Sequence, residues 1–174
     1  MELLLPIGIA VGVLLLIVII TAITLKNGLI GKSNQVDTSF STIDVMLKKR
    51  FDLIPQLMGC VDGYMKHESE LMQKLTELRS TPREAEALAK VNRQMGESIS
   101  SFFIKSEAYP DLKASDQFLM LQRSINEMEE QLAAARRSYN VAIQDYNDAV
   151  LKFPSSIIAN RNGWTKKTYF EFND

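Results

Sequence analysis

The feature that most constrains this chain is an uncharged apolar run near its start. The run extends from Leu3 to Leu25, LLLPIGIAVGVLLLIVIITAITL, and is 23 residues long. As an α-helix it would be ~34 Å long, enough to cross the ~30 Å hydrocarbon core of a bilayer. A cleaved signal peptide would need a basic residue before a shorter run and small residues at its exit. We therefore expect residues 1–25 to be an uncleaved single-pass anchor that binds membrane lipid through residues 3–25.

Two details of the anchor bear on its partners and its orientation. Gly8 and Gly12 form a G-x-x-x-G spacing, which lets two membrane helices approach closely, although glycine is also common in membrane helices in general. Lys26 and Lys32 follow the run, whereas Glu2 precedes it. The positive-inside rule then predicts a soluble domain in the cytoplasm.

The residues after the anchor have the pattern of a long helix with one buried face. Residues 26–35 are expected to be a juxtamembrane linker, and residues 36–174 the soluble domain. Apolar residues then recur at steps of three and four, and Arg50 and Glu68 fill two of the positions. The apolar phase is the same on both sides of Pro55, so we predict one helix over about 35–80, kinked near Pro55. The apolar positions are Val36, Phe40, Ile43, Leu47, Ile54, Leu57, Val61, Tyr64, Leu71, Leu75 and Leu78.

Two further helices are predicted. Thr81-Pro82-Arg83-Glu84 has the residues of a capping box, and the helix that it begins should end near Ser106. Tyr109 to Leu112 is expected to be a loop, and Ser115 the N-cap of the third helix. Two sets of apolar residues in that helix each repeat every seven residues, as in the seam of a coiled coil. They are Phe118, Ile125, Leu132, Tyr139, Tyr146 and Phe153, and Leu121, Met128, Ala135, Ala142 and Ala149.

The same helix carries the pair Tyr-Asn twice, at Tyr139-Asn140 and Tyr146-Asn147. The tyrosines belong to the seam, and a buried tyrosine hydroxyl needs a hydrogen-bond partner. The asparagines lie on the flank of the seam, where they can bond a neighbouring helix or loop and fix the register. The alternative is that the two pairs line a site for a partner or a small ligand.

The C-terminal segment differs from the helices in being rich in aromatic residues. After the Asn162-Gly163 turn signal it contains Trp164, Tyr169, Phe170 and Phe172, and we expect these to dock an extended tail on a helix surface. A basic and aromatic tail can also lie on lipid. If the three helices alternate in direction, however, the third ends far from the membrane, which argues against lipid contact.

The composition limits the chemistry of the soluble part. It contains 20 basic and 20 acidic residues once Glu2 is set aside, so it lacks the positive surface of a nucleic-acid binder. Its one cysteine excludes an internal disulfide, and its one histidine, in His67-Glu68-Ser69-Glu70-Leu71, lacks the second histidine of H-E-x-x-H. We expect no catalytic residue, no metal site and no cofactor.

Several segments of the chain resemble the LemA family of bacterial membrane proteins. They are IDVMLKKRFDLIPQLMGCVDGYMKHE (43–68), EAYPDLKASDQFLMLQ (107–122), RRSYNVAIQDYNDAVLKFPSSIIA (136–159) and the closing KKTYFEF (166–172). The resemblance implies an anchor in the bacterial inner membrane and a soluble domain of long antiparallel helices. It implies no enzymatic site.

The predicted fold is thus all-α: a transmembrane helix, a bundle of three long antiparallel helices and a short aromatic tail. The leading functional hypothesis is a non-enzymatic, membrane-tethered scaffold or adaptor that acts through self-association or through membrane protein partners in the envelope. One alternative is a homo-oligomeric coat that organises or remodels membrane. Another is a small-ligand module around the two Tyr-Asn pairs.

Overall fold

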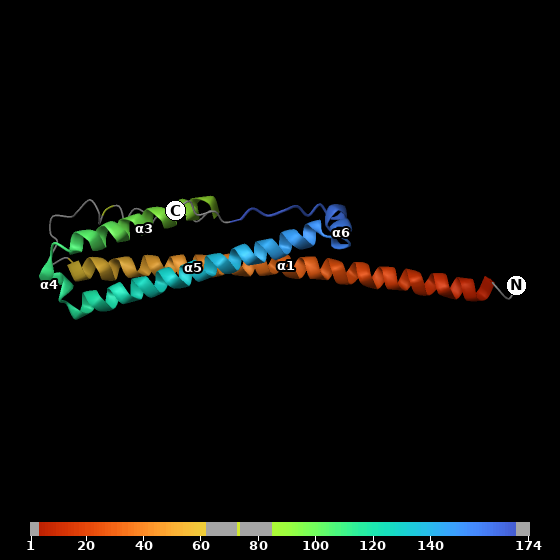
Figure 1. Cartoon of the computed structure of the whole chain (residues 1–174), viewed down its shortest axis with the longest axis horizontal. Helices are drawn as coiled ribbons and strands as arrows, with labels where there is room; N and C mark the ends of the chain where they lie inside the picture. The colour runs from red at the N-terminus through yellow and green to blue at the C-terminus, as the bar shows by residue number, and fades with distance from the viewer. Residues whose placement is uncertain (1–3, 62–72, 74–84, 170–174) are drawn as a thin grey trace. The chain divides into compact units, whose positions relative to one another are not determined.

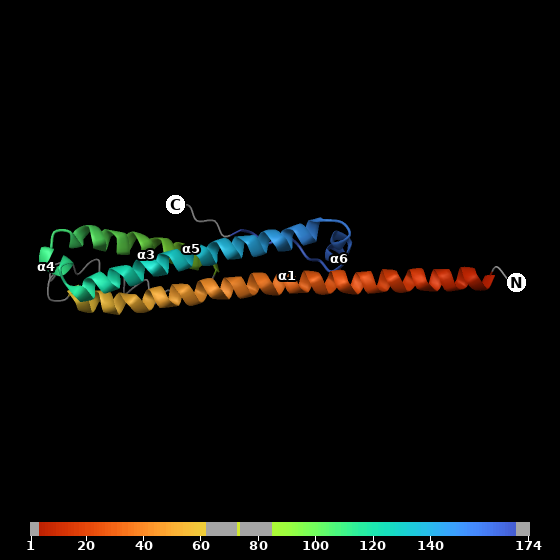
Figure 2. The ribbon, with the colours of Figure 1, turned by 60° about the horizontal axis from the view of Figure 1, so that its bottom comes forward.

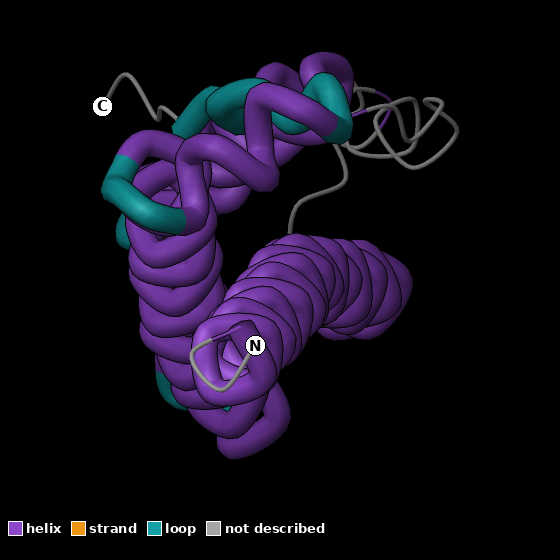
Figure 3. Tube along the Cα trace, turned by 90° about the vertical axis from the view of Figure 1, so that its right-hand side faces the viewer, coloured by secondary structure: helices purple, strands orange, loops and turns teal. Residues whose placement is uncertain are grey.

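The fold is all-helical over the residues that the structure, a computed structural model, describes, namely 4–61, 73 and 85–169 (Figures 1 and 3). This confirms that the fold is all-α, as predicted. The predicted capping box at 81–84 and the predicted end of the first helix near residue 80 lie outside the described residues. The helices are α1 (Leu4–Val61), α3 (Ala85–Ser106), α4 (Pro110–Lys113), α5 (Asp116–Leu151) and α6 (Ser155–Arg161).

The apolar run forms the N-terminal part of α1, which is long and apolar enough to cross a membrane. Residues 6–21 of this part are all exposed, as expected of side chains that face lipid. The hydroxyls of its two threonines form hydrogen bonds within the helix. Thr21 Oγ1 donates to the carbonyl of Ile17 at 2.8 Å, and Thr24 Oγ1 donates to that of Ile20 at 2.9 Å. No polar group of these side chains therefore needs a partner from the bilayer core.

Residues 26–35, expected to be a linker, are helical and lie inside α1. The reason is visible in the spacing of the buried residues. Leu29 lies seven residues before Val36, and the exposed fractions of the two side chains are 1% and 2%. The buried stripe of the soluble domain thus begins four residues after the apolar run, and a continuous helix keeps Leu29 on that stripe.

α1 also continues through Pro55. Its apolar stripe keeps its phase on both sides of the proline, since Ile54 and Leu57 are both buried and Pro55 itself is exposed. A proline in a helix interior costs about 3 kcal/mol, and packing of the stripe offsets that cost. The described helix ends at Val61.

The chain divides into two compact units, each built from parts of α1 and α5. Unit 1 contains Met1–Phe40 and Ser138–Tyr169, and unit 2 contains Ser41–Arg137 and Phe170–Asp174. Unit 1 therefore holds the candidate membrane span, the end of α5, α6 and the described part of the tail. Unit 2 holds the end of α1, the beginning of α5, and α3 and α4.

In unit 1, α1 and α5 lie side by side and run in opposite directions (Figures 1 and 2). The ring centroids of Phe40 and Tyr139 are 5.7 Å apart, and Lys32 pairs with Asp145 at 4.0 Å. The end of α5 and the tail therefore return to the part of α1 that follows the apolar run. The expectation that the third helix ends far from the apolar run is wrong, because it assumed that this helix runs away from that run. The end of the tail, residues 170–174, lies outside the described residues.

The core of unit 1 joins α1, α5 and α6. Its buried residues are Leu29, Val36, Ala142, Ile143, Tyr146, Val150 and Ala159, and Tyr139, Ala149, Ile158 and Trp164 pack against them. Ile143 and Val150 were not among the predicted seam positions. Phe153 was predicted to be one, yet its exposed fraction is 81% because α5 ends at Leu151.

In unit 2, α3 runs in the same direction as α1 and opposite to α5 (Figures 1 and 2). The predicted alternation, with the second helix antiparallel to the first, does not hold for these described helices. A stripe of apolar residues specifies which face of a helix is buried, but it does not specify the direction in which the helix runs. Phe102, Phe103 and Phe118 form an aromatic cluster between α3 and α5, with ring centroids 5.6 to 6.2 Å apart.

The connection between α3 and α5 contains a short helix where a loop was expected. α4 begins at Pro110, whose fixed φ suits a first helical position, and its Leu112 is fully buried. Ser115 directly precedes α5, and its carbonyl accepts a hydrogen bond from the Leu119 amide at 3.0 Å. This is the position that the sequence predicts for the N-cap.

Candidate functional site

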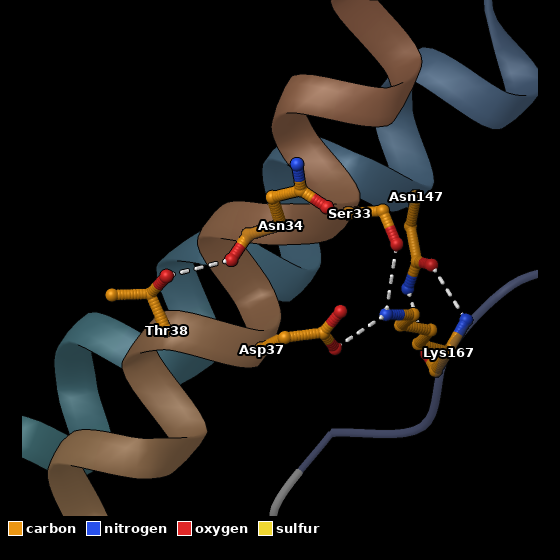
Figure 4. A network of polar contacts seen from close by, with 6 residues as sticks. All are labelled: Ser33, Asn34, Asp37, Thr38, Asn147 and Lys167. Atoms are coloured by element: carbon orange, nitrogen blue, oxygen red, sulfur yellow. Dashed lines mark hydrogen bonds and ion pairs between the residues drawn. The ribbon is translucent and has the colours of Figure 1, made fainter.

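The described residues contain two polar arrangements that hold elements together, one in each unit. The first, which we call the Lys167 clasp, consists of Ser33, Asp37, Asn147 and Lys167, which Figure 4 shows, together with Tyr146. The Asn147 side-chain amide donates to the Lys167 carbonyl at 2.9 Å, and its Oδ1 accepts from the Lys167 amide at 2.9 Å. One side chain of α5 therefore binds the backbone of the tail as a neighbouring strand would.

The Lys167 side chain extends the clasp to α1. Its Nζ donates to Ser33 Oγ at 3.2 Å and to Asp37 Oδ1 at 3.2 Å. The same Nζ lies 5.1 Å from the centre of the Tyr146 ring, within the range of a cation–π contact. One residue of the tail thus connects the tail to both long helices of unit 1.

The structure places the two Tyr-Asn pairs differently. Tyr146 and Asn147 are buried and belong to the clasp and its core, with exposed fractions of 4% and 6%. Tyr139 and Asn140 are half-buried, and Tyr139 packs on Phe40. Burial raises the pKa of the Tyr139 hydroxyl, and the negative charge of Asp37 raises this pKa further.

The aromatic residues of the tail also differ in their positions. Trp164 is half-buried against the core of unit 1, and its amide donates to the Ala159 carbonyl at 2.9 Å, at the end of α6. Tyr169 is exposed. Phe170 and Phe172 lie outside the described residues. Among the four residues predicted to dock the tail, the structure therefore shows core packing at Trp164.

The second arrangement surrounds Arg50 in unit 2. Its side chain is 3% exposed, and its Nη1 donates to Asn92 Oδ1 at 2.6 Å and to the Asn92 carbonyl at 3.2 Å. Nη2 pairs with Glu129 of α5, whose side chain is 39% exposed. Arg50 Nε has no hydrogen-bond partner among the described residues. Burial lowers the pKa of the Arg50 guanidinium, Glu129 counteracts this effect, and Arg136 adds to the lowering.

An open cleft of about 500 Å³ lies beside Arg50, between α3 and α5. Arg50 and Glu129 supply charge at one part of its wall, and apolar side chains line much of the rest. The apolar lining residues are Ile99, Phe103, Ile104, Phe118, Leu119 and Ile125. Such a mixed lining suits an amphipathic segment of a protein partner better than it suits a small polar molecule.

The remaining predicted site residues are Gly8 and Gly12. Both lie on the exposed part of α1, and a Cβ added at either would meet no atom within 4 Å. Within the described part of the chain, no group of three or more His, Cys, Asp or Glu side chains is placed to hold a metal ion.

Sequence reasoning missed the central residue of each arrangement. Lys167 is one of two adjacent lysines, and nothing in its local sequence distinguishes it from a solvated residue. Arg50 had a signal, because it occupies a position of the apolar stripe between Ile43 and Leu57. A charged residue at such a position must find partners on the facing helices, but the sequence does not say which residues these are.

The fold and these arrangements define a helical protein with a candidate membrane span, whose soluble part packs directly against the helix that carries the span. Family comparison matches residues 39–174 to the LemA family. The chain belongs to the LemA family, and this confirms the resemblance that was seen in the sequence.

Individual relatives agree with this assignment. The chain is 26% identical over 140 residues to Protein LemA of Metamycoplasma hominis, covering 78% of this chain and 64% of that protein. It is 20% identical over 191 residues to the magnetosome protein MamQ of Magnetospirillum gryphiswaldense, covering 92% of this chain and 70% of MamQ. The match therefore spans less than two thirds of the length of the Metamycoplasma protein.

Proposed function

We propose that this protein is a non-enzymatic, membrane-tethered scaffold or adaptor, which presents its helix faces to other copies of itself or to membrane protein partners in the bacterial envelope. We place it in the inner membrane with its soluble domain in the cytoplasm. The LemA and MamQ relatives support the part of this proposal that describes a membrane-associated helical protein.

The observation that carries the proposal is the direct continuity between the anchor and the folded domain. Leu29 is 1% exposed in the core of unit 1, only four residues after the apolar run, and α1 has no break there. The Lys167 clasp then ties the tail to the same stretch of α1. An anchor built this way holds unit 1 at the membrane in one orientation, as a scaffold requires, whereas a flexible linker would let it rotate freely.

The cleft in unit 2 is the surface on which we expect a partner to bind. Ile104 and Leu119 line it and remain 69% and 39% exposed. A helix with an apolar face and a basic or acidic flank would cover these side chains and meet the Arg50–Glu129 pair.

The small-ligand alternative has less support from the geometry. Both polar atoms of the Asn147 side chain already bond the Lys167 backbone, and Tyr146 is buried beneath the Lys167 ammonium. A ligand would have to displace the tail to reach them. The coat alternative requires large assemblies, and light scattering of the full-length protein in mild detergent would reveal them.

Photo-crosslinking in cells tests the proposal. A photoreactive residue is placed at Ile104 or at Leu119 in the full-length chain, and at the exposed Lys49 as a control outside the cleft. We expect discrete adducts from the two cleft positions and none from the control. An adduct of twice the chain mass indicates self-association, and another mass indicates a protein partner. If neither cleft position gives an adduct and the protein is monomeric in detergent, the scaffold proposal is wrong.

A further inference from the structure

The turn between α5 and α6 carries a cluster of exposed apolar side chains. We call Leu151, Phe153 and Ile157 the turn patch, and their exposed fractions are 55%, 81% and 58%. Phe153 has the largest exposed fraction among the described large apolar residues. Neighbouring residues of α6, by contrast, are well packed, since Ala159 is fully buried and Ile158 contacts the core. The exposure is therefore a property of this patch and not of a loosely packed α6.

The register of α1 against α5 places the turn patch at the level of the membrane surface. Phe40 of α1 faces Tyr139 of α5. Lys32, eight residues before Phe40, faces Asp145, six residues after Tyr139. Another six residues along α5 lead to Leu151. At the same helical rise this brings Leu151 level with about residue 25 of α1, where the apolar run ends. In both side views α6 lies at the end of α5 nearest the apolar run (Figures 1 and 2).

The charges around the turn patch suit the headgroup region of a bilayer. Lys26, Lys152 and Arg161 are all exposed near this end of unit 1. Lys152 Nζ pairs with Asp148 at 2.7 Å, and Lys32 pairs with Asp145 at 4.0 Å, so neither pair carries a net charge and the positive charge at this end comes from Lys26 and Arg161. Exposed apolar and aromatic side chains flanked by basic residues are typical of surfaces that enter the membrane interface.

We propose that the turn patch lies in the headgroup region of the same bilayer that α1 crosses, on the side where the soluble domain begins. This gives the protein a second contact with lipid, which does not span the membrane. The contact fixes the tilt and rotation of unit 1 about the anchor. The register places the patch level with the end of the apolar run, and three side chains are far too few for a stable interface with a second copy, which buries more than about 1,000 Å².

Lipid-borne quenchers test this placement in the full-length protein. In a Cys60→Ser background, an environment-sensitive fluorophore is attached at Phe153→Cys or at Ile157→Cys, in nanodiscs whose lipids carry a nitroxide near the headgroup. Val141→Cys is the matched control. Val141 is 57% exposed on α5, and it lies ten residues before Leu151, or ~15 Å along the helix.

We expect the nitroxide lipids to quench the labels at positions 153 and 157 at least threefold more than the label at 141, and iodide in the water to quench them less. Far-UV circular dichroism checks that each labelled chain is folded. Equal quenching by lipid at all three positions would overturn the proposal. Shielding from iodide without quenching by lipid would also overturn it, because it would show that protein covers the patch.

Discussion

Arg50 and Glu129 form one ion pair, yet removing its two members should have unequal effects. The Arg50 side chain is 3% exposed and that of Glu129 is 39% exposed. Glu129→Ala leaves a charged guanidinium buried without its carboxylate, whereas Arg50→Met removes the buried charge and leaves Glu129 in contact with water. Arg50 has therefore lost more contact with water than Glu129, and Glu129→Ala should destabilise the protein more than Arg50→Met does.

The magnitudes follow from that asymmetry. Loss of one partner from a fully buried pair costs about 3–5 kcal/mol, and partial exposure of Glu129 points to the lower end, about 3 kcal/mol, for Glu129→Ala. Arg50→Met chiefly leaves Asn92 Oδ1 without its donor, at about 1–2 kcal/mol. For a chain of this size 1 kcal/mol shifts Tm by about 2–4 °C, so Glu129→Ala should lower Tm by about 6–12 °C.

Thermal unfolding of the full-length protein in detergent, followed by far-UV circular dichroism, measures both effects. In the Arg50→Met background, Glu129→Ala should add little, because no buried charge remains to be compensated. If Arg50→Met lowers Tm more than Glu129→Ala does, the desolvation argument is wrong. Equal effects of Glu129→Ala with and without Arg50→Met would show that the two residues are not coupled.

Three further predictions concern the rest of the chain. Asn147→Ala should release the tail, at a cost of about 1–2 kcal/mol, and shift the fluorescence of Trp164 to longer wavelength; an unchanged spectrum would contradict the clasp. Gly31→Ala should stabilise α1 by about 0.5–1 kcal/mol, because nothing lies within 4 Å of the added Cβ. Gly96→Ala should gain less stability in the same thermal assay, because its Cβ would meet a buried guanidinium nitrogen at 3.2 Å. An equal gain in stability would show that this contact yields freely. Because the pKa of Tyr139 is raised, its contribution to stability is present below pH 10 and is lost as the pH rises through the folded-state pKa. The loss of stability at alkaline pH should therefore be smaller in Tyr139→Phe. Identical pH profiles of stability for the two proteins would refute this.

The elements that could be predicted from the sequence are those with a local pattern. The apolar run is long enough to cross a membrane, and the seven-residue repeat of α5 identified residues that are buried, including Phe118, Ile125 and Leu132. The helical conformation of residues 26–35 was not predicted, because a lysine-containing stretch with two glycines is polar on average. Leu29, the residue that keeps it helical, is recognisable only when the stripe is extended backwards from Val36.

The candidate sites were only partly predictable. Asn147 was expected to bond a neighbouring helix or a loop, and its partner is the backbone of Lys167, twenty residues later. The position of Arg50 in the apolar stripe indicated that it needed partners. Its partners Asn92 and Glu129 come from helices whose pairing has no signature in the sequence.

The sequence by itself determined that residues 3–25 suit a membrane and which faces of the long helices are buried, since transfer from water and helical periodicity depend on neighbouring residues. The direction and register of the helices were decided only by the tertiary structure. Those properties depend on contacts between residues far apart in the chain, such as Phe40 with Tyr139, and an apolar stripe packs equally well in either direction. The return of the α5–α6 turn to the end of the apolar run is therefore a result of folding that the local pattern does not contain.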